Sequence, residues 1–243
     1  RRMKSISIVT AAFNECPGII HLANEWLAFF DQHPDISEGE VIICDDHSDW
    51  QQYESLRDAF IGNHQVTILR NEVNEGPGFS FQKAIAQAKF DWTLITDSDG
   101  QFPIINVNQM LSALGDQETD IVFTHRNRKY DNEFNRFGQK VSNKLCNSIF
   151  NSQLQDFSCA FKLVKTPLLQ SLKLDARFMN YSLDHTGKLL NSSAKWIETQ
   201  VTCRVAEARK RNISSEIKRA KNRFLYIAYL FFTQYLRKNR VIF

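Results

Sequence analysis

Two carboxylates stand two residues apart in the segment Asp97-Ser98-Asp99-Gly100-Gln101. The segment follows the apolar run Trp92–Thr96 and precedes Pro103, a residue that suits the first turn of a helix. At a strand end, alternate side chains lie on the same side, so the two carboxylates converge on one point. Mg²⁺ takes one or two protein carboxylates and completes its shell with substrate phosphates and water. The pattern favours a metal site for a diphosphate, and its alternative is an Asp pair that caps the following helix.

Polar residues also end two other predicted strands. Asp45-Asp46 follows the apolar run Glu40–Cys44, and its carboxylates can accept hydrogen bonds from a base or a ribose. Asn74-Glu75-Gly76-Pro77-Gly78 opens a predicted helix that carries Lys83, and backbone N–H groups at such a helix start can approach a phosphate. Each segment also has a purely structural interpretation, an N-cap cluster for the first and a tight turn for the second.

Short β-branched runs alternate with longer helical patterns through the first half of the chain. This alternation predicts a mainly parallel central sheet flanked by helices, the α/β class. In open sheets of this kind ligands bind beyond the carboxyl ends of the strands, which is where the polar segments stand. The predicted strands are Ser5–Phe13, Glu40–Cys44, Gln65–Leu69, Trp92–Thr96 and Asp120–Thr124, and the predicted helices are Gly18–Gln32, Gln51–Phe60, Phe79–Lys89 and Ile104–Leu114.

After Tyr130 the pattern changes. A helix-like stretch runs to Phe150, and an Asp156–Val164 segment, two predicted helices and a Trp196–Val205 strand follow; we interpret this half as the acceptor side. With 243 residues and 43% hydrophobic content, the chain suits one sizeable domain. Its five scattered cysteines include no Cys-x-x-Cys pair, which indicates neither zinc nor disulfides and fits a reducing compartment. No signal segment is expected, and the lack of Gly-x-Gly-x-x-Gly after the first strand excludes a nicotinamide dehydrogenase.

The order and spacing of these segments resemble the family-two glycosyltransferases of the GT-A fold, and within them the polyprenyl-phosphate sugar synthases related to dolichyl-phosphate mannose synthase. The resemblance implies a GT-A domain over residues 1–213, with a nucleotide-binding half over 1–126 and an acceptor half over 127–213, followed by an amphipathic helical extension over 214–243. It rests on Ile8–Glu15, Ile42–Asp49, Asn74–Lys83, Thr96–Phe102, Ile121–Arg126 and Asp156–Lys162, with Arg209–Ser214 as a weaker match.

The resemblance also implies roles for individual residues. Asp97, Asp99 and Gln101 are expected to hold Mg²⁺ or Mn²⁺ at the phosphates of the donor. Arg126 looks like the arginine that faces those phosphates, and Asp156 looks like the residue near the reacting centre. The residues expected to line the nucleotide are Ala11, Phe13, Glu15, Asp45, Asp46, Gly76, Lys83, Asp97, Ser98 and Arg209, with Ala11 and Phe13 standing where the family has proline and tyrosine.

These roles predict a transferase that moves a sugar from a UDP- or GDP-sugar, with metal assistance and inversion. A phosphomonoester has a second pKa of about 6, so it is mostly ionised at neutral pH and needs no general base. Hydroxyl-transferring relatives often carry Glu-Asp where this chain has Gln155-Asp156, and the Gln-x-x-Arg-Trp motif of polymer synthases is absent. We therefore expect a polyprenyl phosphate acceptor. The alternatives are transfer to a hydroxyl of a glycan or glycolipid in cell-surface polysaccharide synthesis, with Asp156 as base, and a non-catalytic membrane-associated scaffold.

The chain is basic towards its carboxyl-terminal end. From Lys218 to Phe243 it has seven Lys or Arg residues and no Asp or Glu, around the apolar run Phe224–Phe232. That run has nine residues, against the roughly 20 that span a bilayer. We expect it to lie on an anionic membrane face, which places the protein in the cytoplasm on the inner side of the membrane. The alternative is a helix packed on the domain or in a homodimer interface, and nucleic-acid binding is not expected.

Overall fold

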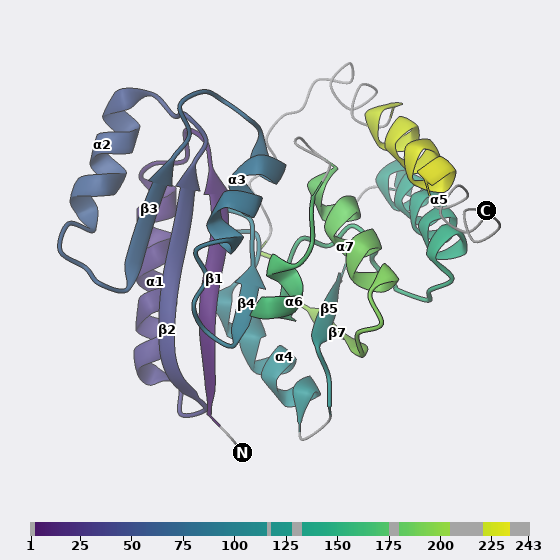
Figure 1. Cartoon of the computed structure of the whole chain (residues 1–243), viewed down its shortest axis with the longest axis horizontal. Coiled ribbons are helices and arrows are strands. Elements are labelled where there is room, and N and C mark those ends of the chain that lie inside the picture. The colour runs from purple at the N-terminus through teal and green to yellow at the C-terminus, as the bar shows by residue number, and fades with distance from the viewer. Residues whose placement is uncertain (1–2, 116–117, 128–132, 175–179, 205–220, 234–243) are drawn as a thin grey trace.

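A central sheet with helices on both faces organises the chain (Figure 1). The computed structural model describes residues 3–115, 118–127, 133–174, 180–204 and 221–233. In this part of the chain, seven strands form one sheet in the order β3-β2-β1-β4-β6-β5-β7. The α/β class predicted from the sequence is confirmed.

Strands and helices alternate along the first half, as the sequence pattern predicts. Helix α1 has the predicted bounds, and a 3₁₀ turn, η1 (Ile104–Asn106), leads into α4. A further helix covers residues 221–233. The strands are β1 (Lys4–Ala12), β2 (Ile36–Asp45), β3 (Val66–Arg70), β4 (Trp92–Ile95), β5 (Ile121–Arg126), β6 (Lys162–Lys165) and β7 (Trp196–Val201), and the helices are α1 (Gly18–Gln32), α2 (Trp50–Ala59), α3 (Pro77–Ile85), α4 (Val107–Leu114), α5 (Glu133–Phe150), α6 (Thr166–Gln170) and α7 (Tyr181–Asn191).

The central strands are buried on both faces. β1 pairs in parallel with β2 and β4, and β2 pairs in parallel with β3. Ile6 and Ile8 of β1 belong to one apolar cluster while Val9 belongs to the other, because successive side chains of a strand point to opposite faces. Parallel strands also place their carboxyl ends at one edge of the sheet. The polar segments after β1, β2 and β4 therefore meet at that edge.

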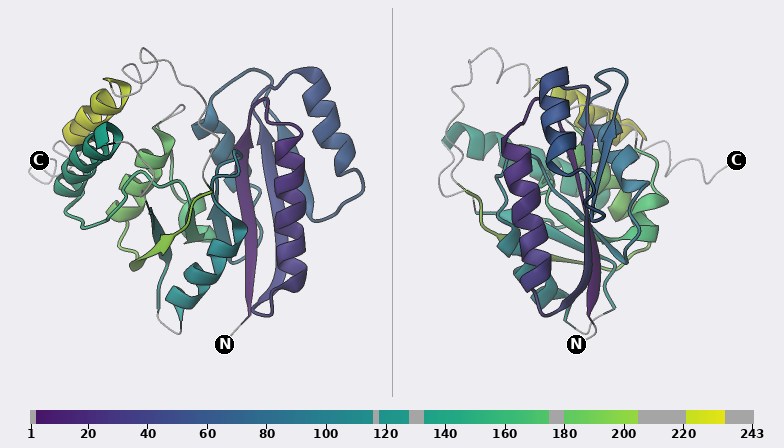
Figure 2. Two further views of the ribbon diagram at one scale, coloured as in Figure 1. Left: turned by 180° about the vertical axis from the view of Figure 1, so that it is seen from behind. Right: turned by 90° about the vertical axis from the view of Figure 1, so that its left-hand side faces the viewer.

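Two helical layers cover the sheet (Figure 2). The first apolar cluster joins one face of the sheet to α1, α2 and α4 through side chains such as Trp26, Leu56 and Met110. The second joins the other face to α3, α6 and α7 through side chains such as Phe81 and Leu169. The two faces together fix the positions of the strand ends.

The region around β5 and β6 differs in detail from the sequence prediction. β6 lies antiparallel between β4 and β5 and extends one residue past the Asp156–Val164 segment, to which the sequence pattern assigns no direction. β5 continues two residues past Thr124, because its pairing with β7 runs through Arg126 and Val201. Arg126 is therefore the last residue of a strand and not part of the loop after it.

Helix 221–233 lies beside α5 at the edge of the molecule (Figures 1 and 2). Its Ile227 and Leu230 are buried in the second apolar cluster. The predicted nucleotide residue Arg209 and the remainder of the predicted extension lie outside the described residues. Among the helices that the structure describes, none has the length and apolar character needed to cross a membrane.

Candidate active site

The predicted metal carboxylates lie directly after β4 at the carboxyl edge of the sheet. Asp97 is half-buried, and its Oδ1 accepts a hydrogen bond from the hydroxyl of Tyr181, the first residue of α7. Asp99 is exposed, and its Oδ1 accepts a hydrogen bond of 3.0 Å from the backbone N–H of Gln101. Ser98 is half-buried between the two. The turn thus presents one anchored and one outward-facing carboxylate.

The oxygen atoms of this turn suit a cation site that is open to further ligands. Burial raises the pKa of Asp97, the Tyr181 hydroxyl opposes this shift, and the charge of Asp99 adds to it. A cation beside Asp97 would favour its ionised form. In the described ranges no three His, Cys, Asp or Glu residues gather as a closed metal cage. Two carboxylates with the amide oxygen of Gln101 fit Mg²⁺ or Mn²⁺, which leave further positions for phosphate and water.

Asp46 joins the loop after β2 to the turn that opens α3. Its buried Oδ1 accepts hydrogen bonds from Asn71 Nδ2 at 2.8 Å and from the N–H of Glu75 at 2.9 Å. Its Oδ2 accepts one from the N–H of Gly76 at 2.8 Å. Gly76 has a φ of +88°, a conformation that favours glycine. Two of the predicted nucleotide segments are therefore held together by a carboxylate with internal partners on both oxygens.

Asp45 pairs with a cation that the sequence analysis passes over. Its Oδ2 lies 2.5 Å from Nη1 of Arg70, the last residue of β3, and also accepts a hydrogen bond of 3.2 Å from the N–H of Ser48. The guanidinium of Arg70 lies over the rings of Tyr53, at 4.4 Å from its centroid, and Trp50, at 5.5 Å. Trp50 is 59% exposed. The edge near Asp45 therefore carries a flat aromatic and guanidinium surface.

Lys83 holds α3 to the end of β3. Its Nζ donates to the carbonyl of Arg70 at 2.7 Å and to Oδ1 of Asn71 at 3.2 Å. The sequence predicts that Lys83 binds a donor phosphate, because it follows a turn whose N–H groups can approach an anion. Its phosphate role stays a prediction, since part of its hydrogen-bonding capacity is used within the chain.

The loops after β1 and β2 bond to each other. The N–H of Asn14 donates to Ser48 Oγ at 2.9 Å, and the N–H of Asp49 donates to Asn14 Oδ1, also at 2.9 Å. Asn14 has a φ of +54°, which turns the chain sharply out of the strand. The predicted nucleotide residues here are Ala11 and Glu15, which are half-buried, and Phe13, which is exposed.

Arg126 and Asp156, the two predicted catalytic residues, bind each other. Arg126 Nε lies 2.7 Å from Asp156 Oδ2, and its Nη2 lies 3.2 Å from Oδ1. Asp156 is only 5% exposed and also accepts a hydrogen bond from Gln139 Nε2 at 3.2 Å and from Ser158 Oγ at 3.1 Å. Burial lowers the pKa of Arg126, the charge and hydrogen bonds of Asp156 raise it, and the net shift is upward. The two residues form a bidentate ion pair in which Asp156 is buried and Arg126 is half-buried.

A buried lysine interacts electrostatically with both the carboxylate turn and this ion pair. Lys162 is 1% exposed, and its Nζ donates to the carbonyl of Cys159 and, at 3.3 Å, to Ser182 Oγ. Burial lowers the pKa of Lys162 to about 8, while the charges of Asp156 and Asp97 raise it. A buried lysine amine is therefore in electrostatic contact with both Asp97 and Asp156.

The sequence alone assigns no role to Lys162, Tyr181, Gln139 and Arg70. Tyr181 and Gln139 come from α7 and α5 and meet the site only through the fold, so no local spacing marks them. Arg70 ends β3 and could have been found, because strand ends at this edge are where polar residues gather. The fold places the predicted residues after β2, β4 and β5 at one edge of the sheet, and it brings Asp97 within electrostatic reach of Arg126.

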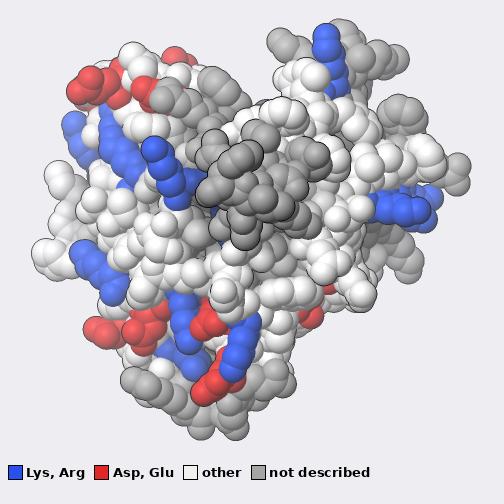
Figure 3. All heavy atoms as spheres, turned by 45° about the vertical axis from the view of Figure 1, so that its right-hand side comes forward, with Lys and Arg blue, Asp and Glu red and all other residues white. Residues whose placement is uncertain are grey.

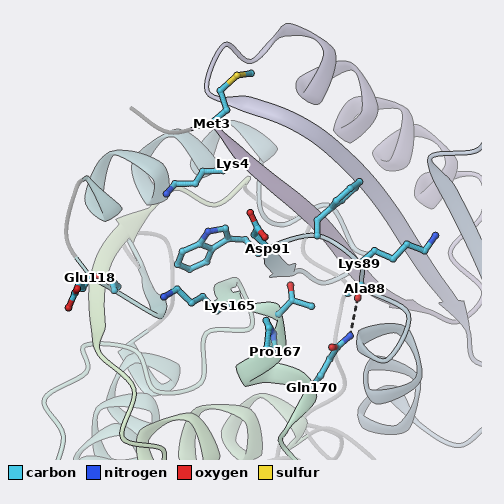
Figure 4. A pocket seen from close by; sticks show the side chains of 13 residues that line it. Met3, Lys4, Ala88, Lys89, Asp91, Glu118, Lys165, Pro167 and Gln170 are labelled. Atoms are coloured by element: carbon cyan, nitrogen blue, oxygen red, sulfur yellow. Dashed lines mark hydrogen bonds between the residues drawn. The ribbon is translucent and has the colours of Figure 1, made fainter.

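A pocket of about 520 Å³ lies at the opposite end of the sheet (Figure 4). It is lined by residues at the start of β1 and β4 and at the end of β6, including Lys4, Trp92 and Lys165. None of the predicted site residues lines it. Because ligands of open α/β sheets bind at the carboxyl edge, we place the site there and not in this pocket.

Comparison with known proteins identifies the relatives of the chain. Residues 7–172 match the family described as Glycosyl transferase family 2. The chain is 24% identical over 174 residues to the undecaprenyl-phosphate 4-deoxy-4-formamido-L-arabinose transferase of Edwardsiella ictaluri, covering 71% of this chain and 52% of that protein. It is 22% identical over 173 residues to the enzyme of the same name from Proteus mirabilis, covering 70% and 52%. The chain thus spans about half the length of these relatives.

Solved structures share the fold. Glucosyl-3-phosphoglycerate synthase of Mycobacterium tuberculosis, in complex with Mn²⁺, uridine diphosphate and phosphoglyceric acid, superposes with a TM-score of 0.67 at 13% identity, over 94% of this chain and 78% of that one. The complex of that synthase with Mn²⁺, uridine-diphosphate-glucose and phosphoglyceric acid gives 0.67 at 14% identity, over 94% and 80%. These superpositions confirm the predicted GT-A fold.

Proposed function

The chain belongs to glycosyl transferase family 2, and from this premise we propose that it transfers a sugar, with inversion, from a nucleotide diphosphate-sugar to a polyprenyl phosphate. The choice of acceptor rests on one observation: the carboxylate of Asp156 is already bound by other side chains. This buried carboxylate is bound by Arg126 and Gln139, so it is a poor proton acceptor and a good anchor for the arginine. An acceptor that is already ionised needs an anchor for its charge and no base.

The donor would bind at the edge formed by the ends of β1, β2 and β4. Asp97, Asp99 and the amide of Gln101 are the residues that would hold a divalent cation, and solved relatives of the same fold are complexes with Mn²⁺ and a uridine diphosphate-sugar. A bound cation supplies Lewis-acid stabilisation of the charge that develops on the leaving diphosphate. Asp45 and Asp46 shape the loops on which the base would rest. The contacts of Ser98 and Arg209 with the nucleotide remain predictions.

The acceptor phosphate would lie near half-buried Arg126 and buried Lys162. Arg126 is fixed by two hydrogen bonds to Asp156, and Lys162 lies close enough for the charges of Asp156 and Asp97 to shift its pKa. Fixed positive charge in a site from which water is excluded stabilises phosphate oxygens more strongly than it does in water. The curated relatives are named for transfer to undecaprenyl phosphate, which agrees with this acceptor class.

Transfer to a hydroxyl is the second candidate. It is favoured by the solved complexes of the same fold that contain phosphoglyceric acid, whose hydroxyl group suits a base-assisted reaction. In that case Asp156 would have to release Arg126 to accept a proton. A short polyprenyl phosphate and the matching polyprenol, offered with the same donor, separate the two candidates: the proposal requires product from the phosphate alone.

Helix 221–233 has the chemistry to meet a bilayer surface. Phe231 and Phe232 are 59% and 60% exposed, and Leu225 is exposed as well. The helix carries no acidic residue, and the adjacent α5 exposes Lys140 and Lys144. On the face drawn in Figure 3, the right-hand side of the molecule shows basic side chains and little acidic surface. Exposed aromatics beside basic residues suit an anionic lipid surface.

Replacing both Phe231 and Phe232 by Ser is expected to weaken binding to anionic liposomes about 10-fold or more. Burial of a Phe side chain contributes roughly 1.5–3 kcal/mol, part of which is recovered at a membrane interface. Cosedimentation with vesicles that contain phosphatidylglycerol measures the change. Ile61→Ser, at a residue that is 81% exposed beyond α2, is the matched control. Equal liposome binding by the double variant would instead favour an aromatic face that packs in a homodimer.

A further inference from the structure

Arg223 of helix 221–233 bonds to a residue that in turn holds the catalytic ion pair. Its Nη1 donates to Oε1 of Gln139 at 2.8 Å. Gln139 lies on α5 and is buried, and its Nε2 donates to Ser158 Oγ at 2.7 Å and to Asp156 Oδ1 at 3.2 Å. Both ends of the Gln139 amide are therefore occupied. A hydrogen-bonded path leads from the carboxyl-terminal helix to the site.

The orientation of the Gln139 amide determines which of its atoms faces the carboxylate of Asp156. An amide oxygen only accepts hydrogen bonds and its nitrogen only donates, while a guanidinium only donates. Arg223 therefore holds the oxygen of Gln139 on its own side and turns the NH₂ group towards Asp156. Without Arg223 the amide oxygen loses this charged donor, and the placement of Gln139 then depends on its bonds to Asp156 and Ser158. A buried amide oxygen without its partner is costly, and Gln139 can shift to recover one, which moves its NH₂ group relative to Asp156.

The position of Asp156 in turn fixes the position of Arg126. The carboxylate bonds to Arg126 through both oxygens, at 2.7 and 3.2 Å, while one of those oxygens also receives Gln139. A change at Gln139 therefore alters the anchor of the arginine. The helix that supplies Arg223 is seated by Ile227 and Leu230, which are buried beside residues of α5 and α7. The position of the helix and the orientation of the arginine are linked.

We propose that Arg223 is a positioning residue: it couples the seating of helix 221–233 to the orientation of Arg126, so that sugar transfer depends on this helix being in place. The proposal rests on the proposed function in one respect, the assignment of Arg126 to the reacting phosphates. The linkage between Arg223 and Arg126 itself is a property of the hydrogen bonds and holds for either acceptor class.

The first test compares variants by their kinetics. Arg223→Gln is expected to lower kcat about 10-fold, the effect of one lost hydrogen bond to a charged group, with the Kd for nucleotide within twofold of wild type. Arg223→Lys keeps a donor and is expected to recover part of the loss. Lys221→Gln makes the same change of charge at an exposed position of the same helix and is expected to leave kcat unchanged. Thermal melting checks that each variant is folded.

A double-mutant cycle with Gln139→Leu tests whether Arg223 acts through Gln139. If it does, Arg223→Gln has no further effect on kcat once Gln139 is Leu. A second loss of about 10-fold in the double variant would overturn the proposal, and so would an unchanged kcat in Arg223→Gln.

A measurement independent of transfer separates failure of this inference from failure of the proposed function. The Nε–H of Arg126, assigned by its loss in Arg126→Lys, is followed by ¹⁵N-edited NMR. Its hydrogen exchange is expected to be at least several-fold faster in Arg223→Gln than in wild type or Lys221→Gln. Unchanged exchange would refute the linkage even in an active enzyme, whereas faster exchange in a protein that uses another acceptor would retain the linkage and refute only the polyprenyl phosphate.

Discussion

Replacing Asp99 by Asn removes the metal-dependent part of nucleotide affinity. We expect the Kd for UDP or GDP in Mn²⁺ to rise at least about 100-fold, since loss of a direct ligand exceeds the 10–100-fold effect of an outer partner. Asp99 is exposed, and the hydrogen bond that it accepts from the N–H of Gln101 can be kept by the amide oxygen of Asn. The substitution therefore spares the fold. Isothermal titration with nucleotide, in Mn²⁺ and again in EDTA, measures the effect.

The control for this experiment is Asp91→Asn. Asp91 is an exposed acid at the opposite end of the sheet, beside the pocket of Figure 4, so its loss changes net charge equally without touching the proposed cation site. Its variant is expected to bind nucleotide like wild type in both conditions. Nucleotide affinity that is unchanged in Asp99→Asn with Mg²⁺ or Mn²⁺ present would refute the metal assignment.

Asp156→Asn is expected to abolish transfer while donor binding persists. Asn cannot form the charged bidentate pair with Arg126, so the arginine loses its fixed orientation at the reacting phosphates. We expect kcat to fall about 10²–10³-fold, since breaking a buried ion pair costs roughly 3–5 kcal/mol. Part of that cost lowers the free energy of unfolding, so denaturant unfolding accompanies the kinetics. Asp120→Asn, which breaks the 2.8 Å pair with Lys165 away from the site, is the matched control.

The two possible roles of Asp156, base or anchor for Arg126, predict different results in a double-mutant cycle with Arg126. If Asp156 anchors Arg126, then Arg126→Gln has a similar effect and the double variant is hardly worse than either single variant. If Asp156 is the base for a hydroxyl, the two losses add, because proton removal and phosphate stabilisation are separate contributions. Additive losses would move Asp156 to the role of base and favour the hydroxyl acceptor.

The sheet could be predicted because its central strands are short, β-branched and buried on both faces. β1 and β2 read as apolar runs, and the polar residues after them mark the edge where ligands bind. Asp97 and Asp99 were found by this logic. The sequence pattern does not mark β6 as a strand, because it begins and ends with lysine and is defined by its antiparallel pairing with β4 and β5.

The contacts that join the two halves of the site could not be read from the sequence. Tyr181 reaches Asp97 across 84 positions of sequence, and Gln139 reaches Asp156 from another helix. A long-range hydrogen bond leaves no periodic signal in one sequence. The pairing of Arg126 with Asp156 is a further example: both residues were selected as catalytic, but their mutual contact is visible only in the fold.

The central claim is tested most directly by a transfer assay with purified protein and Mn²⁺. A panel of UDP- and GDP-sugars is offered a short polyprenyl phosphate and, in separate reactions, sugar hydroxyls and phosphoglyceric acid. We predict product on the polyprenyl phosphate alone, with loss of product in Asp99→Asn. Product on hydroxyl acceptors alone would contradict the account, and absence of product with every donor and acceptor would favour a non-catalytic scaffold that retains this fold.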